Sequence, residues 1–172
     1  MTGRSAQHGT IRLERRYKAA PARVFAAWAD PKARAKWDVP GRWVIAEQRF
    51  DFREGGRERK RFGPSDDPHF VADTLYLDIV PDRRIVFSYS MTSRGEPISV
   101  SLTTVEILPD EQQAKLLLTE QVAFLDGKDN AANREEGLAS MLDKIGETCR
   151  RSRCHPERSE GPFLRPKGPS LR

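Results

Sequence analysis

The feature that most constrains this chain is a change of hydrophobic period near residue 127. Six segments before it alternate apolar and polar residues, as half-buried strands do, and the short turns between them predict antiparallel pairing. These segments span residues 44–52, 57–62, 70–79, 84–91, 98–108 and 114–124. After residue 127 the apolar residues recur at spacings of three and four, which predicts one amphipathic helix of about 20 residues. Since no other long helix is predicted, this helix is expected to lie on the sheet.

The N-terminal part of the chain adds a strand and two short helices. Residues 10–17 alternate like the later strands. Pro21 begins a short helical pattern, and Asp30 with Pro31 ends it and caps a second helix that is expected to reach Trp37. The predicted fold class is therefore α+β, with an antiparallel sheet and a long C-terminal helix.

The positive charge of the chain is concentrated at its C-terminus. The net charge is +5, but seven of the 30 basic residues and only two of the 25 acidic residues lie from Arg150 onward, so residues 1–149 hold equal numbers of each. A basic, proline-rich segment with few apolar residues cannot offset its ordering entropy, so residues 151–172 are predicted to be a disordered tail. Residues 9–150 are predicted to form one domain. A tail that binds an acidic partner is the alternative.

A second basic stretch lies on the hairpin formed by the first two of the six strands. Its residues are Arg53, Arg57, Arg59, Lys60 and Arg61, interspersed with Glu54 and Glu58. We expect this stretch to be one solvated face of the hairpin rather than a nucleic-acid site.

Several function classes lack their sequence signals. The sequence has no apolar run of roughly 18 residues and no secretory apolar core, so neither a membrane span nor export is predicted, and a cytoplasmic location is expected. Cys149 and Cys154 are expected to be free thiols, because no histidines stand at zinc-ligand spacing from them. His69 follows a loop-like acidic stretch and is assigned no role. No nucleotide-binding glycine loop occurs, so nucleotide binding is not expected, and neither a metal nor a cofactor is predicted.

Several short motifs follow one another in a specific order along residues 9–149. They are Ala20-Pro21 with Val24-Phe25, Trp28, Asp30-Pro31 and Trp37; Phe50-Asp51-Phe52-Arg53 with Gly55-Gly56; Asp78-Ile79-Val80-Pro81 with Arg84-Ile85-Val86-Phe87; Thr119-Glu120-Gln121 with Phe124-Leu125-Asp126-Gly127; and Arg134-Glu135, Gly137 and Leu142-Asp143. This series resembles the bacterial single-domain homologues of the activator of the heat-shock protein 90 ATPase, within the SRPBCC (START-like) superfamily. One position departs from the family pattern: Asp38 stands where an aromatic residue often follows the tryptophan matched by Trp37.

The resemblance implies a helix-grip fold of the START-like, Bet v 1-like kind, in which a curved antiparallel sheet wraps around the C-terminal helix and leaves a cavity between them. It also implies that the cavity binds a small hydrophobic or amphipathic molecule. The superfamily includes polyketide cyclase-like enzymes as well as lipid carriers. Chaperone activation is not implied by itself, because a chain of 172 residues leaves no room for the additional N-terminal domain of the eukaryotic activator.

The candidate ligand site consists of side chains expected on the inner face of the sheet, together with residues of the helices. The predicted ligand-binding residues are Trp37, Phe50, Phe52, Phe87, Tyr89, Met91, Leu118, Glu120, Leu138 and Met141. Each of the apolar residues is explained equally well as ordinary core. The implied cavity is what would turn some of them into ligand contacts.

Glu120 is the most informative polar residue, because it shares its side of the strand with Leu118 and Val122. A buried, unpaired carboxylate could accept a proton or anchor a ligand hydroxyl. Two structural alternatives are a β-bulge that turns Glu120 outward and an internal ion pair with Arg59 or Arg134. Glu120 is therefore a candidate catalytic residue without an assigned role.

Non-enzymatic binding of a small apolar molecule is the predicted function. The alternatives are a cyclase or dehydratase that uses Glu120 with help from Tyr89, a chaperone-interaction module, and a domain whose core is simply filled. The sequence is compatible with a homodimer, and it contains no specific signal for a chaperone partner.

Overall fold

The structure, a computed structural model, describes residues 3–151. Within this part of the chain, seven strands and three helices follow one another in the predicted order. The elements are β1 (Ala6–Tyr17), α1 (Pro21–Ala29), α2 (Pro31–Arg34), β2 (Val44–Phe50), β3 (Arg57–Gly63), β4 (Phe70–Val80), β5 (Arg84–Ser93), β6 (Glu96–Asp110), β7 (Gln113–Leu125) and α3 (Ala131–Arg151). The predicted tail, residues 151–172, lies outside the described residues apart from Arg151, the last residue of α3.

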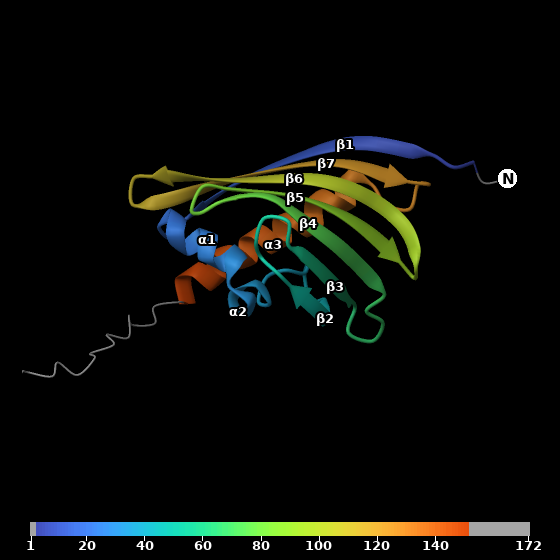
Figure 1. Ribbon diagram of the computed structural model, residues 1–172, viewed down its shortest axis with the longest axis horizontal. Coiled ribbons are helices and arrows are strands. Elements are labelled where there is room, and N and C mark those ends of the chain that lie inside the picture. The colour runs from blue at the N-terminus through green and yellow to red at the C-terminus, as the bar shows by residue number, and fades with distance from the viewer. Residues whose placement is uncertain (1–2, 152–172) are drawn as a thin grey trace, which may run out of the picture.

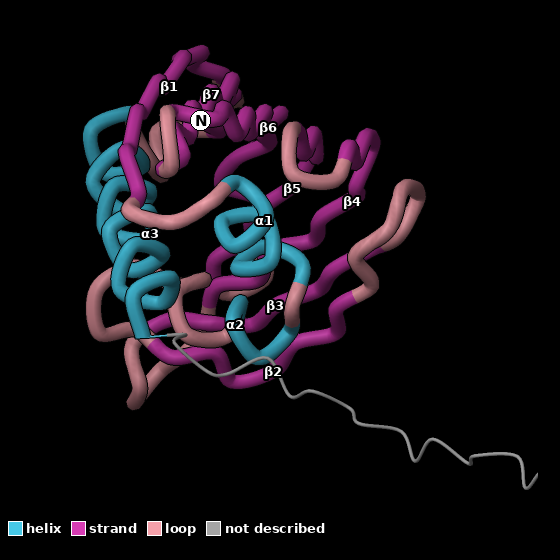
Figure 2. The backbone as a smooth tube through the Cα atoms, turned by 90° about the vertical axis from the view of Figure 1, so that its left-hand side faces the viewer, coloured by secondary structure: helices cyan, strands magenta, loops and turns pink. Residues whose placement is uncertain are grey.

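The strands form one antiparallel sheet in the order β1-β7-β6-β5-β4-β3-β2. Strands β2 to β7 are joined to their neighbours by consecutive hairpins, whereas β1 pairs along its whole length with β7, with Tyr17 opposite Ala114. The sheet curls into an open half-pipe. Its concave side holds α3, and α1 and α2 lie at one end (Figures 1 and 2). The predicted helix-grip α+β fold is confirmed.

The apolar stripe of α3 faces the sheet, as its periodicity predicts. Leu142 and Ile145 are at most 1% exposed, and Cys149 is a buried free thiol. The Tyr17 hydroxyl donates a hydrogen bond of 2.8 Å to the carbonyl oxygen of Leu142, which ties the end of β1 to the middle of the helix. No helix within residues 3–151 is long and apolar enough to cross a membrane.

The second short helix is shorter than the sequence predicts. Asp30 caps α2 as expected, because its side chain accepts a hydrogen bond of 3.1 Å from the backbone N–H of Lys32. The helix nevertheless ends at Arg34 instead of continuing to Trp37. The next residues form a turn in which the backbone N–H of Asp38 bonds to the carbonyl of Arg34 at 3.1 Å. This turn directs Trp37 and Asp38 into the interior.

The basic stretch of the β2–β3 hairpin does not form a single solvated face, and that prediction is wrong for one of its members. Arg57 and Arg59 are exposed, but Glu58 and Lys60 are 3% and 7% exposed. Strand β3 alternates, so Lys60 shares the inner face with Phe62. The sheet therefore places one cation and one carboxylate of this stretch in the core.

Candidate functional site

The cavity lies between the concave face of the sheet and α3, and its volume is about 630 Å³. Its walls are mainly aromatic and aliphatic side chains from α1, the segment after α2, strands β3 to β7 and α3. These include Trp28, Trp37, Trp43, Phe62, Phe70, Phe87, Tyr89, Met91, Ile98, Leu118, Leu138 and Met141. All three tryptophans of the chain are in this wall. Small-molecule sites in proteins have similar volumes, roughly 300–1,000 Å³.

Eight of the ten predicted ligand residues line this cavity. They are Trp37, Phe87, Tyr89, Met91, Leu118, Glu120, Leu138 and Met141. Leu138 and Met141 are only partly buried because the helix faces the cavity at this level, whereas Leu142 and Ile145 pack directly in the core.

Phe50 and Phe52, the other two predicted ligand residues, are not part of the cavity wall. They join an aromatic cluster instead, in which Phe52 lies 5.8 Å from the Phe25 ring and 4.9 Å from the Tyr76 ring. Both side chains face the main core, where they contact rings of α1 and β4 instead of lining the cavity. The alternation that predicts an inward direction therefore holds for both residues, and the neighbouring rings decide that they pack in the core.

Glu120 points inward and forms an internal ion pair with Arg134, one of the two partners suggested by the sequence. Its side chain is completely buried, and its Oε1 atom lies 2.8 Å from Nη1 of Arg134. The same oxygen accepts hydrogen bonds from the Tyr89 hydroxyl at 2.8 Å and the Ser101 hydroxyl at 2.7 Å. Arg59, the other suggested partner, pairs with Asp73 on the surface.

The second guanidinium nitrogen of Arg134 completes this cluster. Nη2 donates to the Ser99 hydroxyl at 2.6 Å and to Asp129 at 2.9 Å. Burial raises the pKa of the Tyr89 phenol, and the charge of Glu120 raises it further, so Tyr89 remains a protonated hydrogen-bond donor at neutral pH. The cluster thus fixes Oε1 of Glu120 rigidly and from three sides.

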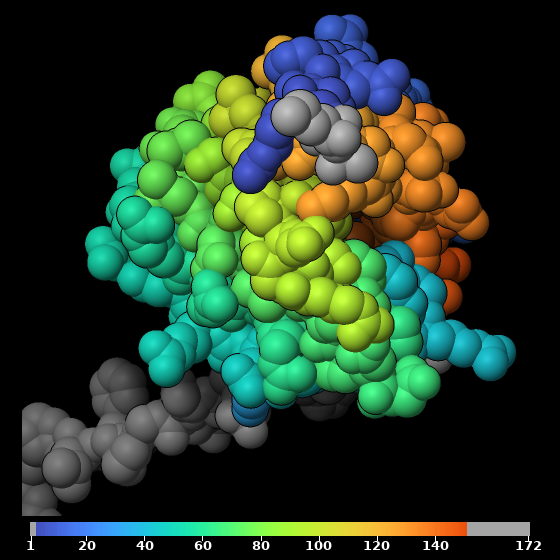
Figure 3. All heavy atoms as spheres, turned by 90° about the vertical axis from the view of Figure 1, so that its right-hand side faces the viewer, coloured from blue at the N-terminus to red at the C-terminus, as the bar shows by residue number. Residues whose placement is uncertain are grey.

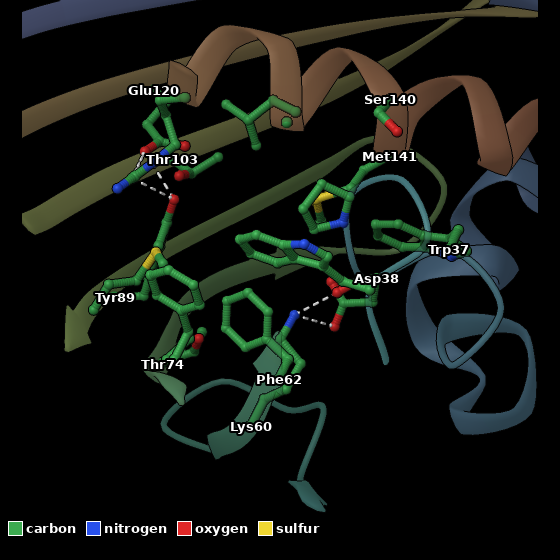
Figure 4. Close-up of a pocket in the computed structure, with 18 of the residues that line it drawn as sticks. Trp37, Asp38, Lys60, Phe62, Thr74, Tyr89, Thr103, Glu120, Ser140 and Met141 are labelled. Atoms are coloured by element: carbon green, nitrogen blue, oxygen red, sulfur yellow. Dashed lines mark hydrogen bonds and ion pairs between the residues drawn. The ribbon is translucent and has the colours of Figure 1, made fainter. Parts of the chain in front are cut away.

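The two oxygens of the Glu120 carboxylate differ in their hydrogen bonding. Oε2 is buried and has no hydrogen-bond partner among the described residues, and the same holds for the hydroxyl oxygen of Thr103. The two residues stand directly opposite each other on β7 and β6, and both line the cavity. Figure 4 shows them side by side below α3.

A second polar cluster lies in another part of the cavity wall (Figure 4). Asp38 lies 3.1 Å from Nε of Arg34 and 2.9 Å from Nζ of Lys60, and Glu58 lies 3.4 Å from Nη2 of Arg34. The Tyr76 hydroxyl donates to Glu58 at 2.5 Å. Burial alone would raise the pKa of Asp38, but Arg34 and Lys60 outweigh it and hold the pKa below its ordinary value. Two cations thus balance two carboxylates.

Most of this second cluster was not predicted from the sequence. The spacing of four between Arg34 and Asp38 permits a helical ion pair, and the shared parity of Glu58 and Lys60 with Phe62 indicates that they face inward. Both signals are in the sequence, but the exposed arginines on either side of Lys60 make the whole stretch resemble one solvated face. The replacement of an aromatic residue by Asp38 is explained by its two cationic neighbours.

Some exposed residues of the β7–α3 connection, the N-terminal half of α3 and the segment before β2 also line the cavity. Lys128, Glu136 and Arg42 belong both to the cavity wall and to the surface. Figure 3 views the end of the molecule where the start of α3 (orange) lies beside the β5–β6 hairpin (yellow-green). The segment before β2 is attached to α3, since the Ser140 hydroxyl accepts a hydrogen bond of 3.0 Å from the backbone N–H of Gly41.

The remaining candidate residues do not form a second chemical site. His69 lies outside the cavity wall, with Nδ1 2.9 Å from the carbonyl oxygen of Asp67. Within residues 3–151, no group of three or more His, Cys, Asp or Glu residues is placed to hold a metal ion.

A curved antiparallel sheet that grips a C-terminal helix and encloses a cavity defines the helix-grip, SRPBCC-type class of proteins. Comparison with family models assigns the chain within this class. The model described as Activator of Hsp90 ATPase homolog 1-like protein matches residues 18–150, so the chain belongs to this family.

Solved structures agree with this assignment. An uncharacterised protein from Rhizobium leguminosarum is 39% identical, with 86% of this chain and 98% of that chain covered and a TM-score of 0.80. The Mll3558 protein from Rhizobium loti is 45% identical, covering 84% and 99% of the two chains, with a TM-score of 0.77. Protein CV1439 from Chromobacterium violaceum is 27% identical over 80% and 94%, with a TM-score of 0.71. A search of curated proteins gave no match.

Proposed function

We propose that this protein binds a small, largely apolar molecule in the cavity between the sheet and α3, without transforming it. The observation that carries the proposal is the cavity itself, about 630 Å³ of space walled mainly by aromatic and aliphatic side chains. A domain whose only task is to be stable gains nothing from such a space, because interiors normally pack without voids. Filling it with an apolar ligand would recover the missing contacts.

The charges around the cavity support an uncharged ligand. Every buried cation in the wall already lies within 4 Å of a carboxylate: Arg34 and Lys60 of Asp38, and Arg134 of Glu120. A charged ligand group would find no unpaired buried partner of opposite sign and would lose its hydration on entry. The apolar part of the wall is therefore the main source of binding free energy in this proposal.

The test uses N-phenyl-1-naphthylamine, an uncharged dye whose emission increases in apolar surroundings. We expect saturable binding of about one dye molecule per chain, with energy transfer from the tryptophans in the cavity wall. Met141→Trp should weaken binding at least several-fold by filling the space, whereas Glu147→Trp on the exposed side of α3 should leave it unchanged. Non-saturable binding that is equal in both variants would refute the proposal.

An enzyme of the cyclase or dehydratase kind is the second candidate, and the free Oε2 atom of Glu120 is the observation that favours it. Oε2 could accept a proton from a bound substrate while Tyr89 holds the other oxygen in place at 2.8 Å. Glu120→Gln distinguishes the two functions, because it keeps the shape and removes the acid–base group. A binding protein should retain its dye affinity within a few-fold, whereas an enzyme should lose turnover by roughly 100-fold or more.

A further inference from the structure

The pair formed by Glu120 and Thr103 has an unusual imbalance of hydrogen bonds. Oε1 of Glu120 accepts from three donors, while Oε2 of the same carboxylate and Oγ1 of Thr103 have no partner among the described residues. Glu120 is 0% and Thr103 1% exposed. Buried polar atoms in folded proteins nearly always have partners, and the cost of leaving one unpaired is greatest for a charged group.

The sheet register places these two atoms on one spot of the cavity wall. Thr103 on β6 is directly opposite Glu120 on β7. Opposed residues on one face of an antiparallel sheet have Cβ atoms roughly 5 Å apart. A single hydroxyl group of a ligand can therefore donate to Oε2 of Glu120 and accept from the hydroxyl of Thr103.

The residues around Glu120 and Thr103 disfavour other ligand groups at this spot. A carboxylate or phosphate at this spot would face the negative charge of Glu120, and Arg134 is already held by Glu120, Asp129 and Ser99. An ether or a methyl group would leave Oε2 without a donor. A hydroxyl group satisfies both residues without adding charge, because it donates to Oε2 and accepts from the Thr103 hydroxyl.

We infer that the natural ligand is an uncharged molecule with an apolar body and a hydroxyl group that is bound by Glu120 and Thr103. This inference rests on the proposed ligand-binding function and adds to it the class of ligand and the residues that recognise its polar end. The body of the ligand lies against Phe62, Phe87, Leu118 and Met141, which line the cavity.

The test compares three probes with the same biphenyl body. They are 4-phenylphenol, which offers a hydroxyl donor, 4-methylbiphenyl, which has a methyl group of similar size, and biphenyl-4-carboxylate, which is an anion. Affinities are measured by displacement of N-phenyl-1-naphthylamine and by quenching of the tryptophans in the cavity wall. We expect the phenol to bind roughly tenfold or more tightly than the methyl compound, although the methyl compound is the more apolar, and the carboxylate to bind most weakly.

Variants assign the preference to the proposed residues. Thr103→Val removes the hydroxyl and should lower the affinity for 4-phenylphenol roughly threefold to tenfold, without changing that for 4-methylbiphenyl. Thr103→Ser keeps a hydroxyl and should retain the affinity for 4-phenylphenol. Thr104→Val, a matched substitution at the next residue, whose side chain points to the opposite face of β6, should change neither affinity. Because Oγ1 of Thr103 bonds to no described residue, Thr103→Val should also fold with unchanged or slightly higher stability.

The outcomes separate failure of this inference from failure of the proposed function. If all probes bind with equal affinity, if the carboxylate binds most tightly, or if Thr103→Val weakens the phenol and the methyl compound alike, the inference is wrong while the cavity remains a ligand site. If Thr103→Val markedly lowers the free energy of unfolding in the absence of ligand, the Thr103 hydroxyl stabilises the fold and the inference is wrong. If neither the dye nor any probe binds, the proposed function fails, and this inference fails with it.

Discussion

Removal of Arg134 should be among the most damaging single changes in this protein. Its side chain is 7% exposed, and its two terminal nitrogens make hydrogen bonds of 2.6–3.3 Å to Glu120, Tyr89, Ser101, Ser99 and Asp129. Arg134→Met fills a similar space but leaves the fully buried Glu120 without a cation. Breaking a buried ion pair from one side costs about 3–5 kcal/mol, a large part of the total stability of a domain.

A double-mutant cycle resolves the origin of this cost. Glu120→Gln alone should cost less than Arg134→Met, about 1–3 kcal/mol, because Arg134 keeps Asp129 as a partner at 2.9 Å. The double variant contains no charge at position 120 or 134, so it should be more stable than Arg134→Met alone by at least about 1 kcal/mol. The free energies of unfolding come from urea titrations followed by tryptophan fluorescence, with the slope m checked for constancy. Strictly additive costs in the cycle, or a loss below about 1 kcal/mol for Arg134→Met at neutral pH, would refute the reasoning.

Three further changes test the fold and the second cluster. Leu142→Ala, at a position that is 1% exposed, should lower the free energy of unfolding by about 2–5 kcal/mol, measured as a lower urea midpoint; a loss under about 1 kcal/mol would mean that α3 does not pack as described. The pKa of Asp38 is lowered because Arg34 and Lys60 outweigh the effect of burial. The stability that the ionised Asp38 side chain contributes to the fold is therefore present above the ordinary carboxyl pKa and is lost as the pH falls through the lowered value. Wild type should accordingly lose more stability than Asp38→Asn between about pH 5 and about pH 2, and parallel acid curves would contradict this. Gly56→Ala would place a Cβ atom 2.2 Å from the carbonyl oxygen of Asp51, so it should destabilise the hairpin by about 1–3 kcal/mol in thermal unfolding, and an unchanged midpoint would show that the turn adapts freely.

The elements of this fold follow from the sequence because their signals are local. Alternation in segments such as 114–124 and the spacing of Leu142 and Ile145 depend only on the geometry of a strand or a helix, so they predict β7 and α3 without knowledge of the tertiary structure. The same local argument places Glu120 on the inner face of its strand, where the structure has it. It also places Phe50 and Phe52 on the inner side, but whether they line the cavity or pack in the core depends on the neighbouring elements.

The partners of the buried charges are decided only by the tertiary structure. The sequence allowed Glu120 to pair with Arg59 or with Arg134, and the curvature that brings α3 over β7 selects Arg134. Asp38 and Lys60 are 22 residues apart in the chain and meet only because the turn after α2 lies against the inner face of β3. An ion pair depends on distances between separate elements, which parity and periodicity do not contain. The size of the cavity has the same origin, since it is the volume that the side chains of a curved sheet and one helix leave unfilled.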